Sequence, residues 1–115
     1  KVSFLEGSDQ KLIYLYANCE AFIYPSLYEG FGLTLLEALS FKKKIICSDI
    51  EAFREVCDEA AIYFNPLELE DLKLKLEKTL MGDLHYDENT KNKILKKYSW
   101  KKCALETLDV YKKVL

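Results

Sequence analysis

The chain has 115 residues, of which 50% are hydrophobic, so it can build one domain with one core and is too short for two. Its formal net charge of −2 excludes the strongly basic surface that nucleic-acid binding requires, and we expect no nucleic-acid partner. Its longest apolar run falls far short of the roughly 20 residues that a membrane-spanning helix needs.

The N-terminal segment combines turn signals with short apolar runs. Val2–Leu5 predicts a short strand, and Ser8 or Asp9 can cap the helix that follows it. The predicted apolar face of that helix consists of Leu12, Ile13, Leu15 and Tyr16. Ala21–Tyr24 is a continuous apolar run ended by Pro25, which is typical of a strand buried on both faces of a parallel sheet.

The middle of the chain alternates helices and strands. The pattern predicts a helix from about Gly32 to Phe41, a strand over Lys44–Ser48, a short helix over Ala52–Cys57 and a strand over Ala60–Phe64. This alternation predicts an α/β fold with a mostly parallel sheet of about four strands, flanking helices and right-handed crossovers.

The C-terminal part has a helical pattern throughout. Leucines at helical spacing predict an amphipathic helix that ends near Gly82, Glu88–Tyr98 predicts a polar helix, and Ser99 is a good N-cap for a last helix. The two apolar stripes, which we expect to lie in the core, consist of Leu69, Leu72, Leu76 and Leu80 and of Trp100, Ala104, Leu108, Tyr111 and Leu115. We therefore expect one partial domain over residues 1–115, closed by helices over 86–115.

The cysteines and the histidine give no metal-binding pattern. Cys19, Cys47, Cys57 and Cys103 form no C-x-x-C pair, and His85 is the one histidine of the sequence. We expect four reduced and mostly buried thiols in a reducing compartment, and no bound metal.

Three loops are candidates for a binding site. In parallel sheets, ligands bind outside the carboxyl ends of the strands, where the next loop enters a helix N-terminus. This rule points to Pro25–Gly32, Ser48–Glu51 and Asn65–Leu67, and the first of these loops carries the unusual chemistry.

The first loop and the helix after it combine two glycines with two acids. Gly30 and Gly32 allow the backbone to approach a ligand closely, and the helix N-terminus suits a phosphate. Glu37 can accept hydrogen bonds from adjacent hydroxyls, as acids do for ribose, and Glu29 can accept from a second ring. The combination favours a sugar joined to a nucleoside through a diphosphate. A solvated helix acid at Glu37 and simple helix-dipole stabilisation by Glu29 are the alternatives.

At these residues the sequence resembles the retaining glycosyltransferases of the GT-B fold, family 4 type (glycosyl transferases group 1). Their signature, E-x7-E, is written out as P-S-x-x-E-G-F-G-L-x-x-L-E-A. Its positions are occupied here by Pro25, Ser26, Glu29, Gly30, Phe31, Gly32, Leu33, Leu36, Glu37 and Ala38. The resemblance covers nearly the whole chain, and it implies a Rossmann-like sheet in a truncated C-terminal GT-B domain.

The resemblance implies a role for each residue of the motif. Glu29 would contact the donor sugar near its anomeric carbon, where we favour an electrostatic stabiliser over a nucleophile, and Glu37 would bind the ribose hydroxyls. Backbone amides would hold the sugar at Gly30, Phe31 and Gly32 and the diphosphate at Leu33 and Thr34. The reaction would transfer a sugar from a nucleotide-sugar to an acceptor with retention and without a metal or other cofactor, because positive side chains and the helix end stabilise the leaving diphosphate.

The resemblance also implies partners that this chain does not contain. The family's two earlier strand–helix units carry a basic pair for the diphosphate, and its N-terminal domain carries the acceptor site, so we expect the isolated chain to be inactive. The acceptor would be a glycan or a lipid-linked sugar. Val2–Leu5 would lack its two neighbouring strands, and we expect it to pair elsewhere, to be exchanged with another chain in a dimer or to be poorly ordered.

Three lysines, Lys42–Lys44, stand where the family has G-x-P. They complement the negative C-terminal end of the preceding helix, or they attract the protein to an anionic membrane surface. We therefore expect a cytoplasmic protein, with a peripheral position at the inner face of a membrane as the alternative.

Two rival functions use the same architecture. A GT-B-like nucleotide-sugar epimerase would share the fold, but the E-x7-E spacing argues against it. A non-enzymatic α/β binding module, for instance a receiver-like domain, would need a cluster of acids at the strand ends, and only Asp49 stands at such a position.

Overall fold

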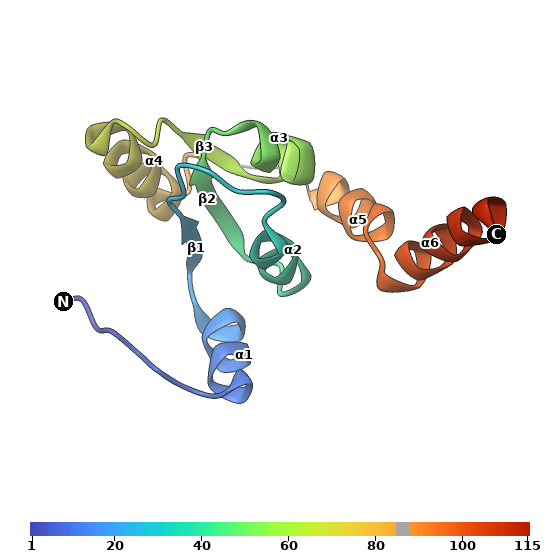
Figure 1. The fold of residues 1–115 in the computed structure, drawn as a ribbon. Coiled ribbons are helices and arrows are strands. Elements are labelled where there is room, and N and C mark those ends of the chain that lie inside the picture. Colours follow the sequence, from blue (N-terminus) through green and yellow to red (C-terminus); the bar gives the residue numbers. More distant parts are fainter. Residues whose placement is uncertain (85–87) are drawn as a thin grey trace.

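The computed structural model of the protein describes residues 1–84 and 88–115 (Figure 1). The elements in chain order are α1 (Asp9–Asn18), β1 (Ala21–Tyr24), α2 (Leu33–Ser40), β2 (Lys44–Ser48), α3 (Glu51–Cys57), the 3-10 turn η1 (Asp58–Ala60), β3 (Ile62–Phe64), α4 (Leu69–Met81), α5 (Glu88–Lys97) and α6 (Trp100–Val114). The predicted α/β fold is confirmed. The predicted start of the closing helices at residue 86, and His85, lie outside the described residues.

The three strands form one parallel sheet in the order β1-β2-β3. Tyr24 lies opposite Cys47, and Ser48 lies opposite Phe64, so all three strands end at the same edge of the sheet. Alternate residues of the buried central strand β2 point to opposite faces. Ile45 packs with α2, α3 and α5 on one face, and Ile46 packs with α4 on the other.

The predicted strand over Val2–Leu5 is wrong. Residues 1–8 have no regular secondary structure, and the Phe4 side chain is 97% exposed. A four-residue segment forms a strand only against a partner that satisfies its backbone groups. No described strand offers it one, so the sheet has three strands in the described part of the chain instead of about four.

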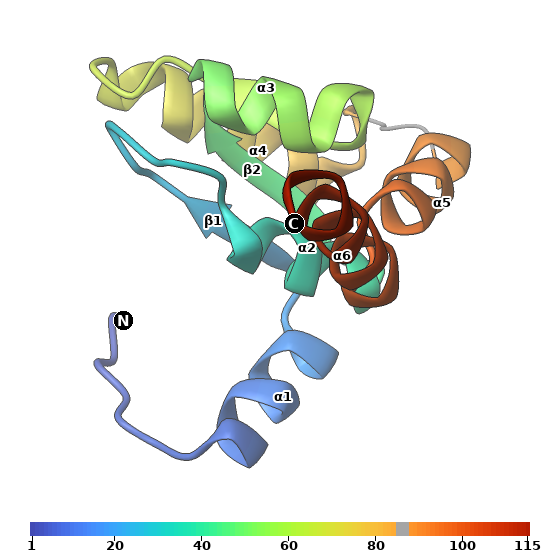
Figure 2. The same cartoon turned by 45° about the vertical axis from the view of Figure 1, so that its right-hand side comes forward.

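Helix α1 stands apart from the other helices in both ribbon views (Figures 1 and 2). Of its predicted apolar face, Leu12, Ile13 and Leu15 are exposed and Tyr16 is buried. Ser8 occupies the predicted N-cap position, but its side chain makes no capping hydrogen bond. Tyr16 is therefore the apolar contact that joins α1 to the domain.

Helix α6 begins at the predicted cap but does not bury its stripe. The Ser99 hydroxyl accepts a hydrogen bond from the Lys102 N–H over 3.1 Å, which confirms the cap. Trp100, Leu108 and Tyr111 are exposed, so the prediction that this stripe lies in the core is wrong. The physical reason is that α6 extends away from the sheet and no described element covers its apolar face (Figure 1).

The stripe of α4 is partly buried in its middle and exposed near its ends. Leu72 and Leu76 pack beneath the sheet against Ile46, while Leu69 and Leu80 near the helix ends are exposed. None of the described helices is long and apolar enough to cross a membrane.

All four cysteines are free thiols. Cys47 and Cys57 are buried, Cys19 is half-buried and Cys103 is exposed, so the expectation of mostly buried thiols holds fully for two of them. Burial raises the pKa of Cys57 to about 12 and raises the pKa of Cys47 as well. The two buried thiols therefore stay protonated and act as apolar core residues.

The three lysines after α2 have separate structural roles. Lys42 ends the helix in the left-handed region, with φ +57°, and the N–H of Lys43 donates to the Ala38 carbonyl over 3.2 Å. Lys43 Nζ donates to the Ala17 carbonyl at the end of α1 over 2.7 Å. Lys44 Nζ donates to the Thr79 carbonyl near the end of α4 over 3.1 Å. Two of the lysines thus complement helix C-termini, but those of α1 and α4 instead of that of α2.

The Lys42 position predicts a stabilising substitution. A left-handed residue at a helix end favours glycine, because a Cβ is strained there. We expect Lys42→Gly to raise the free energy of unfolding by about 1 kcal/mol, measured by urea unfolding. Lys42→Ala is the control, since it removes the charge and keeps the strain. An equal gain in both variants would attribute the effect to the lost charge.

Candidate functional site

The first predicted loop lies at the edge of the sheet where the strands end. This loop and the start of α3 lie at the same end of the domain (Figure 2). Together they line a pocket of about 310 Å³. The pocket is lined by Leu27, Tyr28, Glu29, Gly30, Ile50, Glu51, Ala52 and Glu55. The structure therefore brings the first two predicted loops together. The third loop, Asn65–Leu67, closes on itself through a hydrogen bond from the Leu67 N–H to the Asn65 side chain and does not line this pocket.

Glu29 is held as a carboxylate by two hydroxyl groups. Ser26 Oγ donates to Glu29 Oε1 over 2.7 Å, and Tyr24 Oη donates to the same oxygen over 2.8 Å. The hydrogen bonds from Ser26 and then from Tyr24 lower the pKa of Glu29 below its ordinary value. Within the described residues no donor occupies the other oxygen, Oε2, so Glu29 presents a negative charge and an available acceptor to the pocket.

The two glycines of the loop serve different purposes. Gly32 is the N-cap of α2 and has φ +92°, and a Cβ at this position would lie 2.9 Å from Cε1 of Phe53. Gly30 is outside the left-handed region, and a Cβ there would meet nothing within 4 Å. Of these two glycines, only Gly32 therefore needs the conformational freedom of a residue without a Cβ. Gly30 instead leaves open space beside Glu29.

The start of α2 has the geometry of an ordinary helix N-terminus. The helix opens at Leu33 and Thr34, whose backbone N–H groups point out of the helix N-terminus, and the Leu35 N–H is taken by the Gly32 carbonyl over 3.0 Å. The N-terminal position also carries the positive end of the helix dipole. In the described chain, Thr34 Oγ1 is buried without a hydrogen-bond partner. The first N–H groups of a helix suit a phosphate oxygen.

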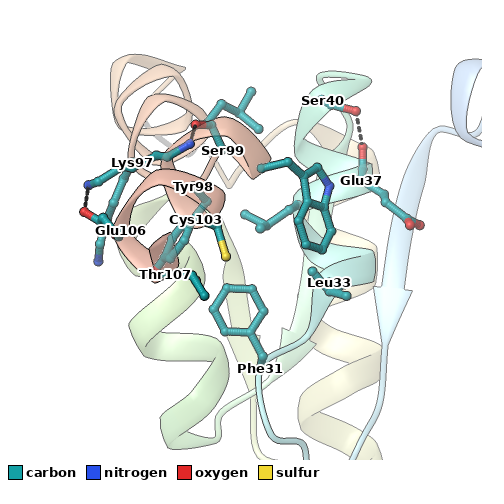
Figure 3. A pocket seen from close by; sticks show the side chains of 14 residues that line it. Phe31, Leu33, Glu37, Ser40, Lys97, Tyr98, Ser99, Cys103, Glu106 and Thr107 are labelled. Carbon is teal, nitrogen blue, oxygen red and sulfur yellow. Dashed lines mark hydrogen bonds and ion pairs between the residues drawn. The ribbon is translucent and has the colours of Figure 1, made fainter. Parts of the chain in front are cut away.

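Glu37 lies one turn further along α2 and accepts a hydrogen bond from Tyr16, which the sequence predicts on the apolar face of α1. Tyr16 Oη donates to Glu37 Oε2 over 3.0 Å. Figure 3 shows the Glu37 carboxylate directed away from Phe31 and Tyr98. Glu37 itself is exposed, so its carboxylate is accessible to a ligand on the α1 side of α2.

A second, larger pocket of about 740 Å³ separates α2 from the junction of α5 and α6 (Figure 3). Phe31 lies edge-on against Tyr98 across this space, with ring centroids 5.3 Å apart, and the Tyr98 hydroxyl donates to the Glu55 carbonyl over 3.3 Å. Tyr98 therefore connects the motif loop to α3 and to the end of α5. The sequence placed it in a helix and gave no sign of these contacts.

The Arg54 side chain, which lies in α3 close to the motif, is already paired. Arg54 donates through Nε and Nη2 to the two oxygens of Asp49, each over 2.7 Å, and lies 3.8 Å from the centre of the Tyr63 ring. This pairing lowers the pKa of Asp49. Asp49 is thus part of an ion pair, which does not favour the binding-module alternative that needed it in an acid cluster. In the described segments no three His, Cys, Asp or Glu side chains are grouped so that they could hold a metal ion.

The chain is similar to known glycosyltransferases. The family model for glycosyl transferases group 1 matches residues 1–98. The O-antigen chain mannosyltransferase B of Escherichia coli is 34% identical over 106 residues, which cover 90% of this chain and 28% of that protein. The MMP alpha-(1->4)-mannosyltransferase of Mycolicibacterium hassiacum is 31% identical over 114 residues, which cover 94% of this chain and 28% of that protein.

A further relative is similar over a shorter stretch. The O-antigen chain mannosyltransferase RfbU of Salmonella typhimurium is 45% identical over 67 residues, 57% of this chain and 19% of that protein. The chain thus spans 28% or less of the length of these three relatives. The match over residues 1–98, together with the parallel α/β sheet, shows that the chain belongs to the glycosyl transferases group 1 family and corresponds to the C-terminal part of a GT-B glycosyltransferase.

Proposed function

We propose that this chain forms part of the donor site of an enzyme that transfers a sugar from a nucleotide-sugar to an acceptor. The observation that carries the proposal is the arrangement around α2. An ionised Glu29 lies before the helix, the first N–H groups of α2 lie at its N-terminus, and a tyrosine-bound Glu37 lies one turn inside it. These groups match in order a sugar, a diphosphate and a ribose.

The residue roles follow the same order. Glu29 contacts the donor sugar and stabilises positive charge at the anomeric carbon, and Glu37 binds the ribose hydroxyls. The backbone amides of Gly30, Phe31 and Gly32 contact the sugar, and those of Leu33 and Thr34 hold the diphosphate. We propose transfer with retention and without a metal or other cofactor. The cations that the diphosphate needs would come from a part of the protein outside this chain, so the isolated chain would be inactive.

The names of the relatives narrow the substrates to be tested. Three of them are called mannosyltransferases, and two act on an O-antigen chain by name. We therefore propose mannose as the transferred sugar and a glycan as the acceptor. A cytoplasmic enzyme that works at the inner face of a membrane would fit such an acceptor.

Donor binding to the full-length protein that carries this chain tests the proposal. GDP-mannose, UDP-glucose and UDP-N-acetylgalactosamine are titrated calorimetrically against the parent and against Glu37→Ala. Loss of a charged hydrogen-bond acceptor costs about 1.5–3 kcal/mol, so we expect roughly 10- to 100-fold weaker binding of the nucleotide-sugar that the parent binds.

The control is Glu77→Ala, which removes another exposed acid, from α4. It should bind as the parent does. Binding of none of the three nucleotide-sugars by the parent, or parent-like binding by Glu37→Ala, would contradict the proposed donor site.

A further inference from the structure

The carboxylate of Glu37 is held by a residue from a distant part of the chain. Tyr16, in α1, donates its hydroxyl to Glu37 Oε2 over 3.0 Å, across 21 residues of sequence. We propose that Tyr16 is a positioning residue of the nucleotide site, which fixes the Glu37 carboxylate in the orientation that binds the ribose hydroxyls. The inference rests on the proposed function, because it takes Glu37 as the ribose-binding acid.

The packing around the Tyr16 ring gives its hydroxyl a defined direction. The side chain is 6% exposed. Its ring stacks on Phe41, with 5.5 Å between centroids and an interplanar angle of 13°, and it meets Phe22 at 5.5 Å and 48°. Phe22 lies in β1 and Phe41 follows the last residue of α2, so elements on two sides hold the ring. Aromatic contacts of this kind restrict both χ angles.

Tyr16 remains a hydrogen-bond donor at every pH at which the protein would work. Burial and then the hydrogen bond to Glu37 raise the pKa of Tyr16 to about 12. A hydroxyl that donates to a carboxylate makes a stronger bond than one between neutral groups. The two carboxylate oxygens together offer about four acceptor sites, so the bond to Oε2 leaves sites for two adjacent hydroxyls.

A packing role alone does not explain the hydroxyl. Tyr16 is the one buried residue of α1. The hydrogen bond from Lys43 Nζ to the Ala17 carbonyl also attaches this helix to the rest of the domain. Phenylalanine would fill the same space between the same two rings. The hydroxyl adds nothing to that packing, and its hydrogen-bond acceptor among the described residues is the acid proposed to bind ribose.

The test compares ribonucleotides with deoxyribonucleotides. GDP and UDP, each with its 2′-deoxy and 3′-deoxy form, are titrated calorimetrically against the full-length parent, Tyr16→Phe, Glu37→Ala and the double variant. For the nucleotide that the parent binds, we expect Tyr16→Phe to weaken the ribose form about three- to tenfold, which corresponds to one hydrogen bond. The deoxy forms should be affected less, so that the preference for ribose narrows. The double variant should bind no more weakly than Glu37→Ala.

Each other outcome overturns the inference in a recognisable way. Equal weakening of ribose and deoxy forms by Tyr16→Phe would show that the tyrosine has only a structural role. Parent-like binding by Tyr16→Phe, with Glu37→Ala still impaired, would show that Glu37 needs no positioning. If Glu37→Ala also binds like the parent, the ribose role of Glu37 in the proposed function fails together with the inference. Thermal unfolding of Tyr16→Phe establishes that the variant is folded, and Tyr16→Leu, which lacks the ring, provides the comparison for lost packing.

Discussion

Replacing Glu29 by glutamine is expected to lower the rate of sugar transfer about 10²- to 10³-fold and to leave donor affinity nearly unchanged. Glutamine keeps the size of the side chain and an oxygen that Ser26 and Tyr24 can reach, but it removes the negative charge. A fixed charge beside a reacting centre stabilises the transition state more than the ground state, and its loss has a cost of this order. The measurement is the transfer rate and the Kd of the donor in the full-length protein.

The pH dependence of transfer provides the second part of this test. Hydrogen bonds from Ser26 and Tyr24 lower the pKa of Glu29, so the acid must be protonated at a lower pH than an ordinary glutamate before its charge is lost. Ser26→Ala removes the larger contribution and should move the acid limb of the rate profile to higher pH. Full transfer by Glu29→Gln, or an acid limb that stays in place, would show that the charge of Glu29 is not used.

The periodic parts of the sequence predicted the structure well. β1 and β2 have their predicted bounds. Helix α2 agrees with its predicted bounds to within one residue at each end, and α4 ends next to the predicted Gly82. Their success has a local cause, because strand and helix patterns follow from neighbours within a few residues. The E-x7-E spacing likewise predicted Glu29 before the helix and Glu37 inside it. Once the start of the helix is known, helix geometry determines where Glu37 lies.

The failures have a different physical origin. An apolar stripe shows which face of a helix can be buried, but it does not show what covers that face. Trp100 and Tyr111 on α6 therefore had the pattern of core residues and are exposed, and Val2–Leu5 had the composition of a strand and pairs with no strand in the described chain. Burial depends on tertiary partners, which the local pattern does not contain.

The contacts that support the two acids were not predicted for the same reason. Tyr16 was predicted on the apolar face of a helix, and it is buried there. Tyr24 was predicted in a strand buried on both faces; it does lie in a strand, but β1 is only partly buried and its Ile23 is 38% exposed. The hydroxyl groups of the two tyrosines reach Glu37 and Glu29, respectively, only because the chain folds back on itself. A tyrosine in an otherwise aliphatic pattern is the signal that could have indicated a polar partner, because a buried tyrosine hydroxyl usually makes a hydrogen bond.

Replacing Gly32 by alanine is expected to reduce the free energy of unfolding by about 2–5 kcal/mol. Two effects add. A residue with a Cβ at φ +92° is strained by about 1–2 kcal/mol, and the new methyl group would lie 2.9 Å from the Phe53 ring, where overpacking costs about 1–3 kcal/mol. Phe53 is fully buried and stacks on Tyr24 at 5.0 Å, so it has no free space into which to move. The measurement is urea unfolding of the parent and the variant.

Gly30→Ala is the matched control, because it adds the same methyl group two residues away where nothing lies within 4 Å. It should unfold within about 1 kcal/mol of the parent, or be slightly more stable because alanine reduces the freedom of the unfolded chain. Its effect should instead be on donor binding, since the open space beside Glu29 is where the sugar is proposed to lie. In Gly32→Ala the displaced Phe53 ring would press on Tyr24, which holds Glu29, so this variant should lose stability and Glu29 alignment together. Equal stability losses in the two variants would mean that the left-handed backbone and the Phe53 contact do not determine the choice of glycine at position 32.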